Sequence, residues 1–98
     1  MEQFKNFEKQ YKTFGGYLSD DPQIKYFDSG ACKCTFSIPL KENKDATPVW
    51  LNCECWGHIA ETIAERYHKN SEITVIGYFK ESEYNGKTYL NFIVKVAM

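Results

Sequence analysis

The segment from Val49 to Trp56, with the sequence VWLNCECW, constrains the fold more than any other part of this chain. Its residues alternate in chemistry with a period of two, which is typical of a β-strand whose two faces meet different surroundings. One face suits a protein core and carries Val49, Leu51, Cys53 and Cys55. The other face carries Trp50, Asn52, Glu54 and Trp56, and therefore both tryptophans of the protein. Large flat rings on a half-polar face predict a platform for flat ligands, and nucleic-acid bases are the commonest of these.

The rest of the chain is predicted to form further strands and one helix. Alternation indicates strands over residues 11–18, 32–40, 73–84 and 87–96, with a shorter extended piece over 23–27. Gly15 and Gly16 predict a bulge or bend in the first strand, and Gly77 predicts an interruption of the strand over 73–84. Asn85-Gly86 predicts a tight hairpin between the last two strands. After Gly57 the period becomes helical, which predicts a helix near 58–68 with an inner face of Ile59, Ala60, Ile63, Ala64 and Tyr67.

The order of these elements predicts the fold class. Three main strands, one helix and two more strands is the order of the all-β, five-stranded Greek-key barrel known as the OB-fold, with its helix between strands three and four. Another small α+β domain is the general alternative. We expect one domain over residues 11–98, preceded by an N-terminal extension over 1–10 that forms a short helix or a loose arm.

Charge and composition restrict how such a domain could act. The chain has 98 residues, a formal net charge of −1 and a pI near 6.1, so bulk positive charge cannot drive binding to nucleic acid. A nucleic-acid binder with this balance must gather its lysines on one face or depend on stacking. No apolar run is long enough to span a membrane, and the N-terminus lacks a signal-peptide core. We therefore expect a cytoplasmic protein without membrane contact, whose four cysteines are reduced.

Several motifs together resemble a known family. They are Gly16-Tyr17-Leu18 followed by Asp21-Pro22, then Tyr26 and Gly30, then Trp50 to Gly57 running into Ala60-Glu61, and finally the run from Ile73 to Phe79. In order and spacing they resemble the bacterial single-stranded DNA-binding proteins, over roughly residues 11–96. The resemblance implies a non-catalytic protein that stacks bases on aromatic side chains, and Trp50, Trp56 and Tyr84 fall where the family has such aromatics. It also implies a homo-oligomer, a dimer or tetramer formed through the first strand.

The chain departs from the family pattern at three places. Residues 41–44 hold no aromatic where the family has one, and the hairpin residues Lys80-Glu81-Ser82-Glu83 are less basic than usual. Both departures predict weaker binding. The sequence given stops at Met98, so we expect no flexible acidic tail of the kind that recruits replication and recombination proteins in the family.

Each candidate binding residue has a competing structural interpretation. Trp50 and Trp56 are predicted to stack on bases, but they could instead cover a subunit interface. Tyr84 could close over a bound strand or pair with Tyr89 across the hairpin. The remaining candidates are Tyr78, which also suits an oligomer interface, and Lys33, Lys80 and Lys87, for which solvated surface charge is the alternative to phosphate contact. Glu54, between the tryptophans, would repel phosphate unless Lys33 pairs with it.

No catalytic site or cofactor site is predicted. Cys32, Cys34, Cys53 and Cys55 form two pairs with one residue between partners, whereas structural zinc sites usually space cysteines by two to four residues in tight turns. We therefore expect these thiols to pack in the core rather than bind metal. Neither His58 nor His68 has a partner at a spacing that indicates catalysis.

The sequence hypothesis is thus a single-stranded DNA-binding protein that coats exposed strands in replication, recombination or DNA transfer. The residues do not separate DNA from RNA as the ligand. A primosomal replication protein is the alternative within this class. The alternative from another class is an OB-like protein-interaction module that no longer binds nucleic acid.

Overall fold

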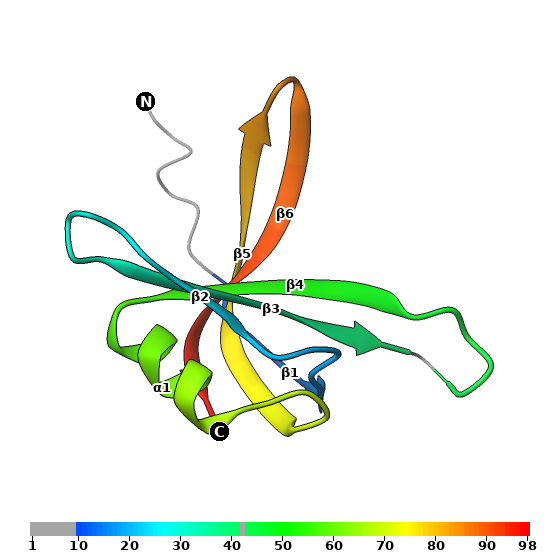
Figure 1. Cartoon of the computed structure of the whole chain (residues 1–98). Helices are drawn as coiled ribbons and strands as arrows, with labels where there is room; N and C mark the ends of the chain where they lie inside the picture. The colour runs from blue at the N-terminus through cyan, green and yellow to red at the C-terminus, as the bar shows by residue number, and fades with distance from the viewer. Residues whose placement is uncertain (1–9, 42) are drawn as a thin grey trace.

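A computed structural model describes residues 10–41 and 43–98. They form six strands and one helix (Figure 1). The bounds are β1 Lys12–Tyr17, β2 Gln23–Tyr26, β3 Cys32–Leu40, β4 Val49–Trp56, α1 His58–Arg66, β5 Glu72–Tyr84 and β6 Lys87–Ala97. Of the predicted N-terminal extension over residues 1–10, residues 1–9 lie outside the described part of the chain.

One sheet joins all six strands in the order β1-β5-β6-β4-β3-β2. Neighbours are antiparallel except β4 and β6, which run parallel and pair Cys53 with Phe92 and Glu54 with Ile93. With one helix between the third and fourth main strands, this arrangement confirms the predicted all-β OB-like class. The short extended piece is a true strand, β2, which pairs with β3. The sheet does not close into a complete hydrogen-bonded barrel, but Ser19, just after β1, donates through its backbone N–H and its hydroxyl to the Ser37 carbonyl of β3.

The core lies on the predicted side of β3 and β4. Its buried members on these two strands are Cys32, Cys34, Phe36, Ile38, Leu51, Cys53 and Cys55. The prediction was wrong for one residue of the inner face, because Val49 is 69% exposed. Val49 pairs with Leu40 at the end of the β3–β4 hairpin, which projects beyond the body of the domain, so nothing covers this side chain (Figure 1).

The expected bulge lies in β5 rather than in β1. Strand β1 pairs with β5 without interruption through Gly15 and Gly16, whereas the β5–β6 register shifts between Ile76 and Gly77. A Cβ on Gly77 would collide with the carbonyl oxygen of Ile93. Gly16 serves another purpose, because a Cβ there would lie 2.6 Å from a methyl carbon of Ile38. This glycine therefore lets β1 approach β3 where the open sheet curls on itself.

Helix α1 packs its predicted apolar face on the sheet, with Ala60 and Ile63 buried. It ends at Arg66, two residues earlier than predicted, because Tyr67 adopts an extended backbone. Asn70 takes a left-handed conformation, with φ of 73°, in the turn that follows. Helix α1 has only nine residues, far fewer than a helix needs to cross a bilayer. Residues 10–41 and 43–98 contain no other helix long and apolar enough to span a membrane.

The β5–β6 hairpin stands away from the body of the domain, on the side of the sheet opposite α1 (Figure 1). Asn85 and Gly86 have φ of 53° and 78°, the paired positive values of the predicted tight hairpin turn. At the hairpin base, the Phe14 ring meets the Phe92 ring edge-on at 5.2 Å and the Phe79 ring at 5.9 Å. This aromatic cluster attaches the projecting hairpin to β1.

Candidate nucleic-acid interface

Trp50 and Trp56 lie on the outer face of the sheet, which we call the tryptophan face and define by Trp50, Asn52, Glu54 and Trp56. The rings are 52% and 47% exposed, respectively. They are six positions apart in the strand, which is about 20 Å along β4. The β3–β4 register places Pro39 beside Trp50 and Lys33 beside Trp56. The face therefore has an apolar end and a basic end.

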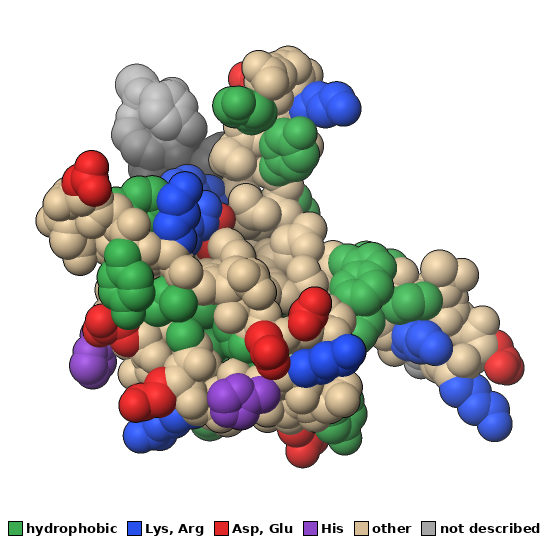
Figure 2. All heavy atoms as spheres, viewed as in Figure 1, with side chains coloured by type: hydrophobic (Ala, Val, Ile, Leu, Met, Phe, Trp, Pro, Cys, Tyr) green, Lys and Arg blue, Asp and Glu red, His purple; other side chains and the backbone are tan. Residues whose placement is uncertain are grey.

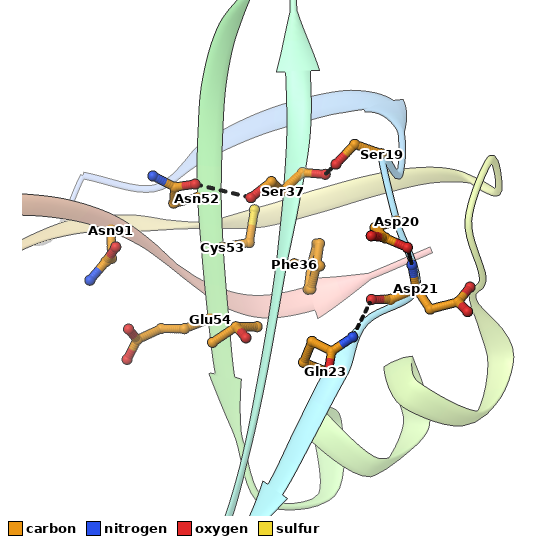
Figure 3. A pocket seen from close by; sticks show the side chains of 11 residues that line it. Ser19, Asp20, Asp21, Gln23, Phe36, Ser37, Asn52, Cys53, Glu54 and Asn91 are labelled. Carbon is orange, nitrogen blue, oxygen red and sulfur yellow. Dashed lines mark hydrogen bonds between the residues drawn. The ribbon is translucent and has the colours of Figure 1, made fainter.

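Polar groups line the surface between the two tryptophans. The Ser37 hydroxyl hydrogen-bonds to the Asn52 amide oxygen at 3.0 Å. A hollow of about 370 Å³ opens here, and Figure 3 shows the Asn52, Glu54 and Asn91 side chains projecting along one side of it. Asp20 and Asp21 border its other side, next to Gln23 (Figure 3). A polyanion on this face would thus meet neutral amides in the middle and carboxylates at one margin.

Trp56 is held by three neighbours. The Phe27 ring stacks on it, with centroids 5.8 Å apart and planes inclined by 19°. The indole Nε1–H donates to Glu54 Oε2 at 3.1 Å, and the Lys33 ammonium lies 5.5 Å from the indole centroid. Lys25 in turn lies 5.2 Å from the centroid of Phe27. Each of the two stacked rings thus has an ammonium group near it, so this corner joins stacking surface to positive charge.

Lys33 and Glu54 form an ion pair, which the sequence had suggested but could not decide. Lys33 Nζ lies 3.8 Å from Glu54 Oε1, and the Glu54 side chain is only 15% exposed. Glu54 therefore does not present an isolated charge on the tryptophan face. Each of its two oxygens has a partner, the ammonium of Lys33 and the N–H of Trp56.

The β5–β6 hairpin separates its charges by side. Cross-strand pairing joins Lys80 to Asn91, Ser82 to Tyr89 and Tyr84 to Lys87, while the alternate pairs join Glu81 to Leu90 and Glu83 to Thr88. Since paired residues share a side and successive residues alternate, both lysines lie on one side and both glutamates on the other. We call these the lysine face and the glutamate face. Although Lys80-Glu81-Ser82-Glu83 has a low net charge, one side of the hairpin, the lysine face, is therefore basic.

The lysine face continues the tryptophan face. The parallel pairing of Glu54 with Ile93 places β4 and β6 side by side with these two residues on the same side. A second hollow, about 200 Å³ in volume, spans the junction and is lined by Lys33, Glu54, Lys80, Ser82, Asn91 and Ile93. Figure 2 shows basic and hydrophobic side chains together on both projecting hairpins. Lys33, Lys80 and Trp56 are thus brought together, with Trp50 at one end of the surface and Tyr84 and Lys87 at the other.

Tyr84 and Tyr78 lie on the same side of β5 but at opposite ends of the hairpin. Tyr84 is 68% exposed and lies opposite Lys87, while Tyr89 lies opposite Ser82, so Tyr84 and Tyr89 do not form a directly opposed pair. Tyr78 is on the same side of β5 as Tyr84, but its ring lies at the hairpin base, 5.6 Å from that of Tyr11. Tyr78 is therefore well separated from the hairpin tip.

All four cysteines are buried free thiols in the core. Burial raises the pKa of Cys53 to about 12, and the neighbouring Cys34 thiol together with burial raises the pKa of Cys55. The protonated forms of Cys53 and Cys55 are therefore favoured. Within the described ranges no three His, Cys, Asp or Glu side chains are placed to hold a metal ion.

Sequence reasoning missed Phe27, Lys25 and Asn91. Phe27 stands beyond the end of β2, and only the pairing of β2 with β3 and of β3 with β4 brings it to Trp56. Asn91 was hidden inside a strand, where its position opposite Lys80 depends on the hairpin register. The alternation of Lys80 and Lys87 with Glu81 and Glu83 was the available signal for a two-sided hairpin.

Comparisons with known proteins show the family to which this chain belongs. The profile of the single-strand binding protein family matches residues 13–96. A single-stranded DNA-binding protein of Thermosynechococcus vestitus is 33% identical over 66 residues, covering 66% of this chain and 55% of its own length. Single-stranded DNA-binding protein 1 of a Nostoc species is 36% identical over 69 residues, covering 69% and 58%. A single-stranded DNA-binding protein of Fusobacterium nucleatum is 32% identical over 91 residues, covering 84% and 59%. The chain thus spans less than two thirds of each relative.

Proposed function

Since this chain belongs to the single-strand binding protein family, we propose that it binds single-stranded DNA on the tryptophan face and the adjoining lysine face. The proposed role is non-catalytic and intracellular. Residues 11–98 form the binding domain in this proposal. The DNA that it covers would be strands exposed in replication, recombination or DNA transfer.

The continuity of the two faces carries the proposal. Trp50 and Trp56 offer rings for bases, and Lys33 and Lys80 border one hollow between them and the hairpin. Tyr84 and Lys87 extend the same side to the hairpin tip. Base stacking contributes about 1–3 kcal/mol per base and tolerates any sequence, while lysine–phosphate contacts add salt-dependent affinity. Together these terms suit binding with little sequence preference.

Self-association is a further part of the proposal. Strand β1 stands at the end of the sheet order and pairs with β5 alone, so its outer edge forms no strand ladder among the described residues. Tyr11 and Tyr17, at its two ends, are both exposed. A second copy could pair with this edge, as free strand edges commonly do. Light scattering coupled to size exclusion would report the mass, and a monomer at high protein concentration would contradict this part alone.

The binding proposal is tested by titrating the protein with oligo-dT and following tryptophan fluorescence at two salt concentrations. We expect quenching that weakens as salt rises, because rings and lysines both contact the strand. A parallel titration with oligo-rU compares DNA with RNA. Folded protein that shows no quenching at tens of micromolar would contradict the proposal and favour a protein-interaction module.

A further inference from the structure

The hollow between β4 and the β5–β6 hairpin has the groups of an anion site. Two lysines, Lys33 and Lys80, border it together with the Asn91 amide and the Ser82 hydroxyl. All four groups can donate hydrogen bonds to an oxyanion. Its volume of about 200 Å³ admits a compact anion.

A carboxylate of the protein itself borders the same hollow. Glu54 reaches Lys33 with one oxygen and the indole N–H of Trp56 with the other. These are the two strongest donors on this part of the tryptophan face. A phosphate that approached Lys33 would therefore compete with Glu54 for the ammonium and would meet its negative charge at close range.

We infer that this hollow is a phosphate subsite for the bound strand and that Glu54 acts as an internal competitor that weakens phosphate binding there. The inference rests on the proposed function. Glu54 holds Lys33 and Trp56 in place without DNA, and a backbone phosphate must draw Lys33 away from it. With Lys33, Lys80 and Glu54 all charged, the subsite carries one net positive charge, and without the Glu54 charge it would carry two.

The test is Glu54→Gln, which retains an oxygen for the Trp56 N–H and removes the charge that opposes phosphate. We expect oligo-dT binding to tighten roughly fivefold in low salt, since repulsion between close unit charges is lost. We also expect the slope of log K against log salt to steepen by up to about 0.7, which corresponds to one more phosphate neutralised on a single strand. A purely structural role for Glu54 would loosen Trp56 and would not steepen this slope.

Two variants make the test specific. Glu81→Gln changes the net charge equally but lies on the glutamate face of the hairpin. It should leave both affinity and slope nearly unchanged. Combining Glu54→Gln with Lys33→Gln should remove most of the tightening, because Glu54 then has no ammonium to release.

The outcomes separate the two proposals. Wild-type binding, with tightening by Glu54→Gln and not by Glu81→Gln, supports both. Wild-type binding with equal or weaker binding by Glu54→Gln overturns the inference and leaves the proposed function standing. Equal tightening by both variants also overturns it, because bulk charge would then explain the effect. If neither wild type nor Glu54→Gln binds, both proposals fail.

Discussion

The ring of Phe27 stacks on the indole of Trp56, with centroids 5.8 Å apart. Trp56 is therefore part of a small assembly, whereas the side chain of Trp50 makes no ring contact or hydrogen bond among the described residues. The two ends of the tryptophan face differ in consequence. At one end a base would meet a single ring without a ring partner, and at the other it would meet a ring held by three neighbours.

Removing either tryptophan should weaken oligo-dT binding. Trp50→Ala and Trp56→Ala should each cost about 1–3 kcal/mol, the range for loss of one stacked base. Phe27→Ala should cost less than Trp56→Ala, because it loosens the indole without deleting it. Fluorescence anisotropy of labelled oligo-dT measures all three affinities. Val49→Ala is the matched control, since Val49 is exposed next to Trp50 but points to the other side of β4. Unchanged affinity for Trp56→Ala would remove this ring from the binding surface.

The two sides of the hairpin should respond differently to loss of charge. Lys87→Gln should weaken binding and reduce the steepness of the salt dependence by up to about 0.7, the loss of one phosphate contact on a single strand. Glu83→Gln, on the glutamate face, should alter neither quantity appreciably. Isothermal titration at three salt concentrations gives both affinities and slopes. A response of similar size in both variants would show that the hairpin contributes only its overall charge.

Two adjacent glycines should differ sharply in their tolerance of alanine. Gly16→Ala should destabilise the fold by about 1–3 kcal/mol, the usual cost of an overpacked contact, because its Cβ would press on Ile38. At Gly15 the nearest atom to an added Cβ is Thr74 Oγ1 at 3.6 Å, an ordinary contact. Gly15→Ala should therefore be neutral or slightly stabilising. Urea unfolding followed by circular dichroism measures both, and equal losses would contradict the close approach of β1 and β3.

The buried thiol of Cys53 should make the fold sensitive to alkali. Its pKa is raised from an ordinary value of 9.0 to about 12, so above pH 9 the folded chain retains a proton that the unfolded chain releases. Stability should therefore fall as pH rises from 9 towards 12, by at most about 1.4 kcal/mol per pH unit for this one group. Urea unfolding at pH 8 and pH 10 measures the change. Cys53→Val should lose less stability over this interval, and an equal loss would assign the effect to other groups.

Local pattern was sufficient to predict most of the fold. Alternation in VWLNCECW and in residues 32–38 depends only on which side of a strand meets the core, and each strand records this in its own sequence. The helical period after Gly57 and the Asn85-Gly86 turn are equally local. The OB-like order followed from these elements.

The predictions that failed depended on where elements end and what lies across from them. Val49 continues the apolar alternation of β4, but the hairpin extends past the core before that residue is reached. No bulge forms at Gly15 or Gly16, whereas the interruption predicted at Gly77 is a bulge where the backbone of Ile93 approaches closely. The stacking of Phe27 on Trp56 likewise requires three strands in register. Lys33 was predicted as a possible partner of Glu54, and the pairing of β3 with β4 brings the two together.

The β5–β6 hairpin is positively charged on one side and negatively charged on the other, because its lysines and glutamates lie on opposite sides. A β-ribbon with its side chains is about 10 Å thick, close to the screening length of about 8 Å at physiological ionic strength. The two fields are therefore felt separately by a passing polyanion, which is attracted on one side and repelled on the other. The resulting torque turns the incoming strand toward the lysine face before any contact forms. Because added salt shortens the range of both fields, this orienting effect should weaken as ionic strength rises.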